Sequence, residues 1–342
     1  MENEFLFFIN ERLNAKQIEF RPMNRKREDW ESVLARLEFE PARYLYNVVR
    51  YYNFYFAEKF SLLLDQSTIV YSNNKPVGIW PLMIAKENDR TSIAIKSFGG
   101  GVMPPQIVAD YPIRASKRLQ HKLLELLDSY CNRNSFDQLV LSDVFVGEIG
   151  VSEWYSQTVH KAEVTVSDHV QYLNLQRGNE YANAHIRKAY KPLISKSQKR
   201  FSTVLGTSSN SESFKIYKQL HHEVSGRITR NSTTWKAQHD LLKDNNAFCS
   251  LVFDGQKPVG AAYFIKSHDE VSYFSGAYSK DYLNESVGHL ALYNAIQHAI
   301  SQKIKWFRIG HIRQQASQKL NDIDFFKNGF VSHIITENTS YL

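Results

Sequence analysis

The alternation of apolar and polar residues follows the same pattern at two places in this chain. The first is an apolar run from Ile69, a polar turn at Asn73-Asn74, the tetrapeptide Lys75-Pro76-Val77-Gly78 and a second apolar run. The second has the same order around Lys257-Pro258-Val259-Gly260, with Asp254-Gly255 in the turn. Apolar arms on either side of such a turn are typical of a β-hairpin. The pattern predicts two hairpins, each with its proline near the start of the returning strand, where the ladder needs no N–H donor.

The segments after each hairpin also occur in one order: a third strand, a loop, an amphipathic helix and a last strand. After the first hairpin we place them at residues 92–97, 115–132 and 138–141, and after the second at 271–278, 286–302 and 305–309. Gly78 and Gly260 lie about half the length of the 342-residue chain apart. This repetition indicates an internal duplication. We expect two α/β modules, over residues 1–165 and 166–342.

Before the first hairpin the pattern is less regular. Residues 1–40 are expected to form a strand and a helix, the helix running from Asp29 to Leu37. Residues 41–60 are rich in Tyr and Phe, which would suit either core packing or the wall of an acceptor groove. The glycine loop Gly99-Gly100-Gly101 permits tight turns or a close approach to a ligand. It is not a P-loop, because no Gly-Lys-Ser/Thr follows it.

The composition adds a class and a compartment to this picture. The apolar content of 43% and the charged content of 23% are those of a soluble globular protein. Cys131 and Cys249 lie in separate modules without metal-ligand spacing, which indicates a reduced environment and no metal site. No apolar stretch approaches the roughly 20 residues that span a bilayer, and the short run Phe5 to Ile9 is not expected to be a signal peptide. We expect a cytoplasmic protein without a transmembrane segment, and peripheral contact with a membrane stays open.

The charge favours an anionic partner. The net charge is +7 and the pI is near 9.1, which favours a nucleotide, a phosphorylated precursor, RNA or a lipid surface. The most basic segment, residues 183–200, contains no acidic residue. Its six cations are Arg187, Lys188, Lys191, Lys196, Lys199 and Arg200. Such a run would suit either a solvated helix face or an anion-binding site.

A second polar segment, residues 221–235, adds two more arginines. Arg227 and Arg230 are spaced to share one face and could clamp a phosphate or a carboxylate by bidentate hydrogen bonds. Trp235 begins a further helix, for which Ser232 or Thr233 is the expected N-cap. The cations expected to contribute to one anionic site between the modules are Arg187, Lys188, Arg227 and Arg230.

Together these features resemble a known family. Two tandem modules, a basic segment opening the second, and the run Ser275-Gly276-Ala277 before a helix resemble the FemAB-like peptidyltransferases of the GNAT acyltransferase superfamily. The segment 326–330, Phe-Lys-Asn-Gly-Phe, is similar to that family's Phe-Lys-x-x-Phe-Gly signature with the last two residues inverted. Residues 226–235 are similar to FemAB-related GNAT proteins found with surface-glycan genes. The resemblance implies an α/β (α+β) fold of two tandem GNAT-like modules, each a mixed, mostly antiparallel sheet flanked by helices.

Two segments depart from the family pattern. A typical GNAT pyrophosphate loop is Arg/Gln-x-x-Gly-x-Gly/Ala at a helix N-terminus, whose amides hold the phosphates of acyl-CoA. Residues 284–289 contain one glycine and the acidic Glu285 instead, which weakens the case for coenzyme A in the second module. Relatives often carry Asp before the glycine that ends the last long strand, whereas this chain has Arg308-Ile309-Gly310.

The resemblance implies acyl transfer to an amine, which needs alignment of two reactants and stabilisation of an oxyanion but no covalent nucleophile. Lys327 matches the family lysine and would polarise the carbonyl of the donor ester. His289, at the start of a helix, would take a proton or contact a ligand. The substrate-binding candidates are Arg187, Lys188, Arg227, Arg230, Trp235 and Tyr278.

The expected function is N-acylation of an amino sugar or another amino-bearing precursor of the cell envelope, with acyl-CoA or aminoacyl-tRNA as donor. The substrate would be an anionic small molecule or a lipid-linked sugar. Two alternatives stay open. An aminoacyl-tRNA-dependent peptidyltransferase acting on a peptidoglycan precursor fits the pI and the missing phosphate loop, but this chain lacks the long coiled-coil arm of some relatives. A non-catalytic binding module on a GNAT scaffold would fit the departures at Glu285 and Arg308.

Overall fold

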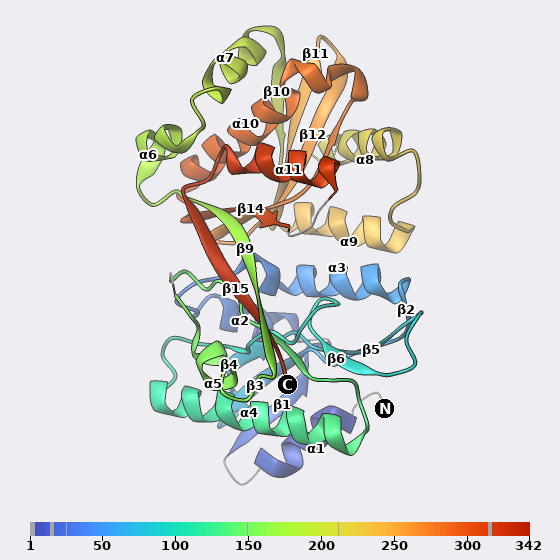
Figure 1. Cartoon of the computed structure of the whole chain (residues 1–342), viewed down its shortest axis with the longest axis vertical. Coiled ribbons are helices and arrows are strands. Elements are labelled where there is room, and N and C mark those ends of the chain that lie inside the picture. Colours follow the sequence, from blue (N-terminus) through green and yellow to red (C-terminus); the bar gives the residue numbers. More distant parts are fainter. Residues whose placement is uncertain (1–3, 14–16, 25, 149, 211, 314–316) are drawn as a thin grey trace. The chain divides into compact units, whose positions relative to one another are not determined.

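The computed structural model describes residues 4–13, 17–24, 26–148, 150–210, 212–313 and 317–342 (Figure 1). The chain divides into two compact units, residues 1–168 with 336–342, and residues 169–335. The boundaries fall inside two strands, β9 (Val164–Asn174) and β15 (His333–Tyr341), so each of these strands runs from one unit into the other. Among the helices of the described residues, none has the length and apolar character needed to cross a membrane.

The first unit contains two small sheets and several helices. The four-stranded sheet has the order β1-β3-β4-β7, and the three-stranded sheet has the order β2-β5-β6. A further strand, β8, pairs antiparallel with β15 through Thr339 and Ser142. The elements are α1 (Glu4–Leu13), β1 (Ile18–Pro22), α2 (Arg27–Leu34), η2 (Ala42–Tyr44), α3 (Tyr46–Ala57), β2 (Phe60–Asp65), β3 (Thr68–Ser72), β4 (Lys75–Trp80), β5 (Met83–Glu87), β6 (Ala94–Lys96), β7 (Gln106–Ile107), α4 (Ile113–Arg133), β8 (Val140–Ser142) and α5 (Glu153–Thr158).

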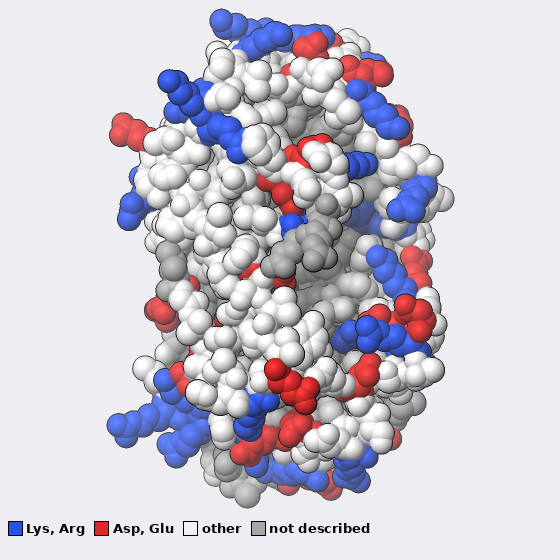
Figure 2. Space-filling view, viewed as in Figure 1, with Lys and Arg blue, Asp and Glu red and all other residues white. Residues whose placement is uncertain are grey.

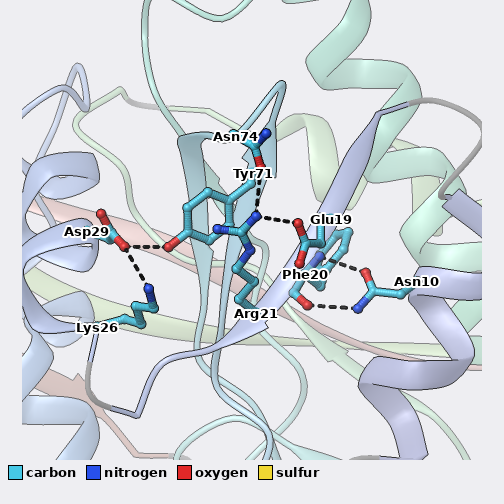
Figure 3. Close-up of polar contacts among 8 residues, drawn as sticks. All are labelled: Asn10, Glu19, Phe20, Arg21, Lys26, Asp29, Tyr71 and Asn74. Atoms are coloured by element: carbon cyan, nitrogen blue, oxygen red, sulfur yellow. Dashed lines mark hydrogen bonds and ion pairs between the residues drawn. The ribbon is translucent and has the colours of Figure 1, made fainter.

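The first predicted hairpin is confirmed as β3 and β4. Asn73 and Asn74 have φ values of 50° and 62°, as a type I′ turn requires at both central positions. Figure 3 shows how the hairpin is tied to its neighbours: Arg21 of β1 donates to Asn74 at 2.8 Å, and the Tyr71 hydroxyl donates to Asp29 of α2 at 2.6 Å. The turn is therefore held by β1, and the strand β3 is held by α2.

The second unit is built on six strands of an eight-stranded sheet, in the order β10-β11-β12-β13-β14-β9, and the last two strands of that sheet are β15 and β8. All neighbouring pairs are antiparallel except β13 and β14, which are parallel. The predicted mixed, mostly antiparallel sheet is confirmed. The elements are α6 (Gly178–His185), α7 (Tyr190–Arg200), β10 (Ser202–Gly206), α8 (Glu212–Ser225), α9 (Ser232–Lys243), β11 (Ala247–Asp254), β12 (Lys257–Lys266), β13 (Glu270–Tyr278), η3 (Lys280–Glu285), α10 (Val287–Ser301), β14 (Trp306–Ile312) and α11 (Gln318–Asn328).

The second predicted hairpin is confirmed as β11 and β12, and its irregularity matches that of the first. In β3–β4, Val70 pairs with Gly78 and the next pair joins Tyr71 to Pro76, so Val77 is an extra residue in the ladder. In β11–β12 the corresponding extra residue is Val259. Both bulges fall at the valine of Lys-Pro-Val-Gly. An extra residue at one place in both copies is a structural counterpart of the sequence repeat.

Some local predictions were wrong. In the described part of residues 1–40 the expected strand and helix are β1 and α2, but a further helix was missed: the short run Phe5 to Ile9 belongs to α1, where Phe5, Phe8 and Ile9 are buried on one face. The strand predicted at residues 92–97 is β6, which pairs with β5 in the three-stranded sheet and not with the hairpin. The strand that pairs with β4 of the hairpin is β7. The N-cap of α9 is Asn231 rather than Ser232 or Thr233: its side chain accepts from the backbone N–H of Thr234 at 2.6 Å.

Helices cover both faces of the sheet in the second unit (Figure 1). Phe264 of β12 stacks on Phe248 and belongs to the core beneath α10. The neighbouring residue Tyr263 points the other way, and its hydroxyl donates to the backbone carbonyl of Gln238 in α9 at 2.6 Å. Successive residues of a strand face opposite sides of the sheet, so α10 covers one face, and α8 with α9 covers the other.

Candidate functional site

The two parallel strands of the second unit pair over a short distance only. The ladder between β13 and β14 runs from Glu270–Trp306 to Ser272–Arg308. β13 continues to Tyr278 and β14 to Ile312, and β14 stays paired with β9 to its end. Within these fully described strands, the backbone of β13 has no ladder partner on β14 beyond Ser272. The strands therefore separate, and the side chains of β13 near this point define the candidate site.

Two tyrosines of β13 meet at their hydroxyls. The Tyr273 and Tyr278 oxygens lie 3.0 Å apart. Gly276 lies between them on the same face, and a Cβ at this position would collide with the Tyr273 hydroxyl. Burial raises the pKa of Tyr273 to about 12 and raises the pKa of Tyr278 well above its usual value. Both phenols therefore stay protonated near neutral pH and can donate hydrogen bonds.

Lys327 of α11 points toward these tyrosines. Its Nζ lies 5.2 Å from the centre of the Tyr273 ring, within the range of a cation–π interaction. Gly310 of β14 has a φ of 152°, which favours glycine, and a Cβ there would lie 2.6 Å from the lysine Nζ, so a larger residue would displace the ammonium from this position. The lysine head is thus held between the backbone of β14 and an aromatic ring of β13.

The surroundings of Lys327 favour its neutral amine over its charged ammonium. Burial lowers the pKa of its ammonium to about 8, and the positive charges of Arg313 and Arg308 act in the same direction. The carboxylate of Asp324, one helical turn earlier, opposes them. Asp324 also accepts from the Arg313 guanidinium at 2.8 Å, which joins the end of β14 to α11. With a pKa of about 8, the lysine is about nine-tenths protonated at pH 7.

His289, in the first turn of α10, lies in an aromatic cluster. Its ring meets Tyr190 edge to face at 4.4 Å and Phe326 at 4.8 Å. Burial lowers the pKa of His289 to about 4, and the charge of Arg187 adds to this effect. The imidazole is therefore neutral at neutral pH. A group with this pKa is a weak proton acceptor, whereas its ring contacts fix Phe326, the residue before Lys327.

Arg187 joins the same cluster. It donates to the Tyr190 hydroxyl at 2.9 Å, and its guanidinium lies 3.9 Å from the centre of the Phe325 ring. A Cβ on Gly288 would lie 3.4 Å from Tyr278 and 3.6 Å from Phe326, so the first turn of α10 bridges the tyrosines and α11. The structure thus brings together four of the predicted site residues. These are Lys327, His289, Tyr278 and Arg187.

Two other predicted residues lie on the opposite face of the sheet. The Arg230 guanidinium is 4.9 Å from the centre of the Trp235 ring and donates to His221 at 3.2 Å. Trp235 belongs to α9 and is buried. These contacts are with α8 and α9, whereas those of Arg187 are with α7, α10 and α11. Arg227 and Lys188 are exposed.

The basic segment forms α6 and α7, and its last arginine is engaged in ion pairs. Arg200 pairs with Glu285 at 2.8 Å and with Asp254 at 3.4 Å, while the Ser197 hydroxyl donates to the Glu285 carbonyl at 3.0 Å. The recess at this point, where α10 begins, has a volume of about 30 Å³, which is room for a water molecule or two. The lysines of α7 are exposed, and Figure 2 shows Lys and Arg side chains over this part of the second unit.

Two residues of the site were not among the sequence candidates. Tyr273 shares the face of Tyr278 because the ladder shifts by one residue at Phe274, and a bulge of this kind has no clear local signal. Asp324 could have been found, since residues at i and i+3 of a helix are neighbours and Asp324 precedes Lys327 by three positions.

Comparison with solved structures shows the fold. The crystal structure of FemX has a TM-score of 0.66 and 10% identity, with 95% of this chain and 97% of that chain covered. The structure of L-PGS from Bacillus licheniformis has a TM-score of 0.59 and 10% identity, covering 92% and 91%. The C-terminal domain (DUF2156) of a putative lysylphosphatidylglycerol synthetase from Agrobacterium fabrum also has a TM-score of 0.59 and 10% identity, covering 93% and 92%.

Comparison of sequences locates a family domain. No curated protein is significantly similar to this chain in sequence. Residues 214–316 match the acetyltransferase (GNAT) domain family. This range contains β13, α10 and β14, and therefore Tyr273, Tyr278, His289 and Gly310, while Lys327 lies beyond it. The predicted resemblance is confirmed at two levels: residues 214–316 match an acetyltransferase domain of the GNAT type, and the chain shares its fold with FemX.

Proposed function

We propose that this protein transfers an acyl or aminoacyl group to an amino group of an amino sugar or another amino-bearing precursor of the cell envelope. The observation that carries this proposal is the position of Lys327, whose ammonium is held between Gly310 and the Tyr273 ring where β13 and β14 separate. In acyl transfer the attacked carbonyl oxygen gains negative charge. A partly buried cation fixed beforehand stabilises that charge more strongly than a solvated one.

The other groups of the cluster have supporting roles in this proposal. The neutral amine of the acceptor attacks the donor carbonyl, and the tetrahedral intermediate forms against the Lys327 ammonium. Collapse breaks the bond from the carbonyl carbon to the donor's oxygen or sulfur, and the leaving group takes up the proton that the nitrogen loses, so that an amide and an alcohol or thiol result. The protonated pair of Tyr273 and Tyr278 can donate a hydrogen bond to that leaving group. His289 holds Phe326 in place. No covalent enzyme intermediate is needed.

The start of α10 favours one class of donor. A helix N-terminus binds the diphosphate of a nucleotide carrier through its free N–H groups and positive dipole end. Here Glu285 precedes the helix, Arg200 is engaged with it, and the recess is too small for a diphosphate. These features support an aminoacyl ester such as aminoacyl-tRNA rather than acyl-CoA. A fold shared with a putative lysylphosphatidylglycerol synthetase supports an acceptor at the cell envelope.

The test is a product assay with two donors. The protein is incubated with acetyl-CoA or with a charged aminoacyl-tRNA and a panel of amino sugars and nucleotide-linked amino sugars, and amide products are detected by mass spectrometry. We expect an amide product that depends on the aminoacyl ester. Lys327→Met should lower its rate by about a hundredfold to a thousandfold, the usual effect of losing one oxyanion donor.

The matched control is Lys319→Met, because Lys319 is an exposed lysine of the same helix. It should retain the wild-type rate. Absence of any amide with either donor would contradict the proposed transfer, and equal rates in the two lysine variants would remove Lys327 from it.

A further inference from the structure

We propose that a groove between α8 and α9 binds a nucleoside phosphate. The groove lies on the opposite face of the sheet from the Lys327 cluster and has a volume of about 620 Å³, a size typical of sites for small molecules and cofactors. Its walls come from facing sides of the two helices, with Phe214 and His222 on α8 and Trp235 and His239 on α9. This site is separate from the acyl-transfer centre and does not depend on it.

The groove is lined by two stacked pairs of rings. His239 lies on Phe214 with ring centres 4.6 Å apart and an interplanar angle of 7°. His222 lies on Trp235 at 5.4 Å and 29°. Phe214 and Trp235 are buried, whereas His222 and His239 are half-buried, so the two imidazoles offer the flat surface on which a nucleobase can stack, with little dependence on base identity. A ligand without a flat ring would leave this part of the groove unused.

Three of the ring residues that line the groove also carry a buried nitrogen without a hydrogen-bond partner. Trp235 is only 3% exposed. Among the described residues, the indole Nε1 of Trp235 and the Nε2 atoms of His222 and His239 have no hydrogen-bond partner. Buried polar atoms are usually paired, and a ligand in the groove would reach these three nitrogens once the side chains that cover them turn aside. The carbonyls and ring nitrogens of a nucleobase are suitable partners for them, after a small adjustment of the covering side chains.

Positive charge lies along the same groove. Lys218 and Lys236 line it, and no ion pair involves either of them within the described part of the chain. The carboxylate in the lining, Glu223, accepts a hydrogen bond from Gln219 at 2.9 Å. The Lys218 ammonium is 5.7 Å from the centre of the Trp235 ring, and the Arg230 guanidinium is 4.9 Å from it, near the start of α9. Cations beside a helix N-terminus favour a phosphate group. The flat rings and ring nitrogens match a nucleobase and the cations match a phosphate, so together they favour a nucleoside phosphate as the ligand.

The test is calorimetric titration of the full chain with AMP and UMP, with adenosine and uridine, and with inorganic phosphate. We expect at least one monophosphate to bind at least tenfold more tightly than its nucleoside or phosphate alone. Lys218→Met should weaken this binding about tenfold through loss of a charge-assisted contact. Trp235→Phe keeps a ring but removes the N–H donor, and should weaken binding several-fold.

Two variants locate the effect. Lys303→Met removes an exposed lysine outside the groove, and Lys327→Met removes the lysine of the acyl-transfer cluster; both should bind the monophosphate as the wild type does. Lys218 is not part of the buried core, so the thermal unfolding temperature of Lys218→Met should match that of the wild type. Binding of phosphate as tight as that of the monophosphates would overturn the proposal, as would unchanged binding by Lys218→Met.

Discussion

The two hairpins share a bulge and a buried glycine but pack against different elements. Each has a bulge at the valine of Lys-Pro-Val-Gly, and each has a buried glycine just after it. Around Gly78 the space is filled by β7: a Cβ there would lie 2.6 Å from Ile107 and 3.1 Å from the Gln106 carbonyl. Around Gly260 it is filled by the first turn of α10, where a Cβ would collide with Val287. The corresponding glycines thus leave room for a strand in the first unit and for a helix in the second.

This difference decides which elements can reach the hairpin. In the first unit the chain after β4 enters a separate sheet, β2-β5-β6. In the second unit β12 continues directly into β13, and the close approach of α10 brings Gly288 and His289 beside Tyr278 and Phe326. The comparison teaches that the duplicated hairpin supplies a frame, while the proposed chemistry depends on α10, α11 and the separation of β13 from β14.

The largest effect should come from Gly260→Ala. The added methyl meets Val287, a buried β-branched residue with little rotamer freedom, so α10 must move. We expect a loss of about 2–3 kcal/mol in the free energy of unfolding, as for an overpacked core, together with a lower transfer rate. Urea denaturation measures the first and the product assay the second. An unchanged midpoint would show that α10 does not depend on this approach.

A smaller effect is expected for His289→Ala, which removes the ring between Tyr190 and Phe326. We expect a loss of about 1–2 kcal/mol in stability and a reduced rate, because Phe326 no longer fixes Lys327. His289→Phe preserves the ring contacts and should restore most of the activity. If His289 is instead the proton acceptor of the reaction, the phenylalanine variant will be as inactive as the alanine variant.

The smallest effect should come from Gly78→Ala in the first unit. The added methyl meets the flexible end of Ile107, which can turn aside, and the Gln106 carbonyl at 3.1 Å, which needs a shift of only a few tenths of an ångström in the two-residue strand β7. We expect a loss of about 1 kcal/mol or less and an unchanged transfer rate, measured by the same denaturation and product assays. A loss as large as that of Gly260→Ala would mean that the two glycines have the same role.

Much of this fold could be predicted because its signals are local. The turns at Asn73-Asn74 and Asp254-Gly255 and the apolar arms beside them specify hairpins without reference to the rest of the chain. The helices expected at 115–132 and 286–302 are α4 and α10, with ends that differ by one or two residues. Lys327 was identified by its resemblance to a family signature, and the structure places it with Tyr278 and His289.

The rest depended on contacts between distant residues. Arg200 meets Glu285 only because α7 packs beside the start of α10, and a run of six cations gives no sign of this. Arg187 and Arg230 lie on opposite faces of the sheet, which is decided by the packing of α8, α9 and α10 rather than by their spacing. Likewise, β6 pairs with β5, and the residue pattern of β6 does not specify this partner.

The most direct test of the central claim is the pH dependence of the transfer rate of the wild type relative to that of Lys327→Arg. Arginine stays charged throughout the accessible range, so the ratio of the two rates cancels the ionisation of the acceptor amine. Since the pKa of Lys327 is lowered to about 8, its ammonium is present below that pH and is lost above it. If the ammonium stabilises the oxyanion, the ratio will be constant below pH 8 and will fall about tenfold per unit above it. A ratio that rises through pH 8 would assign Lys327 as a base, and a ratio that does not change would contradict a role for its charge.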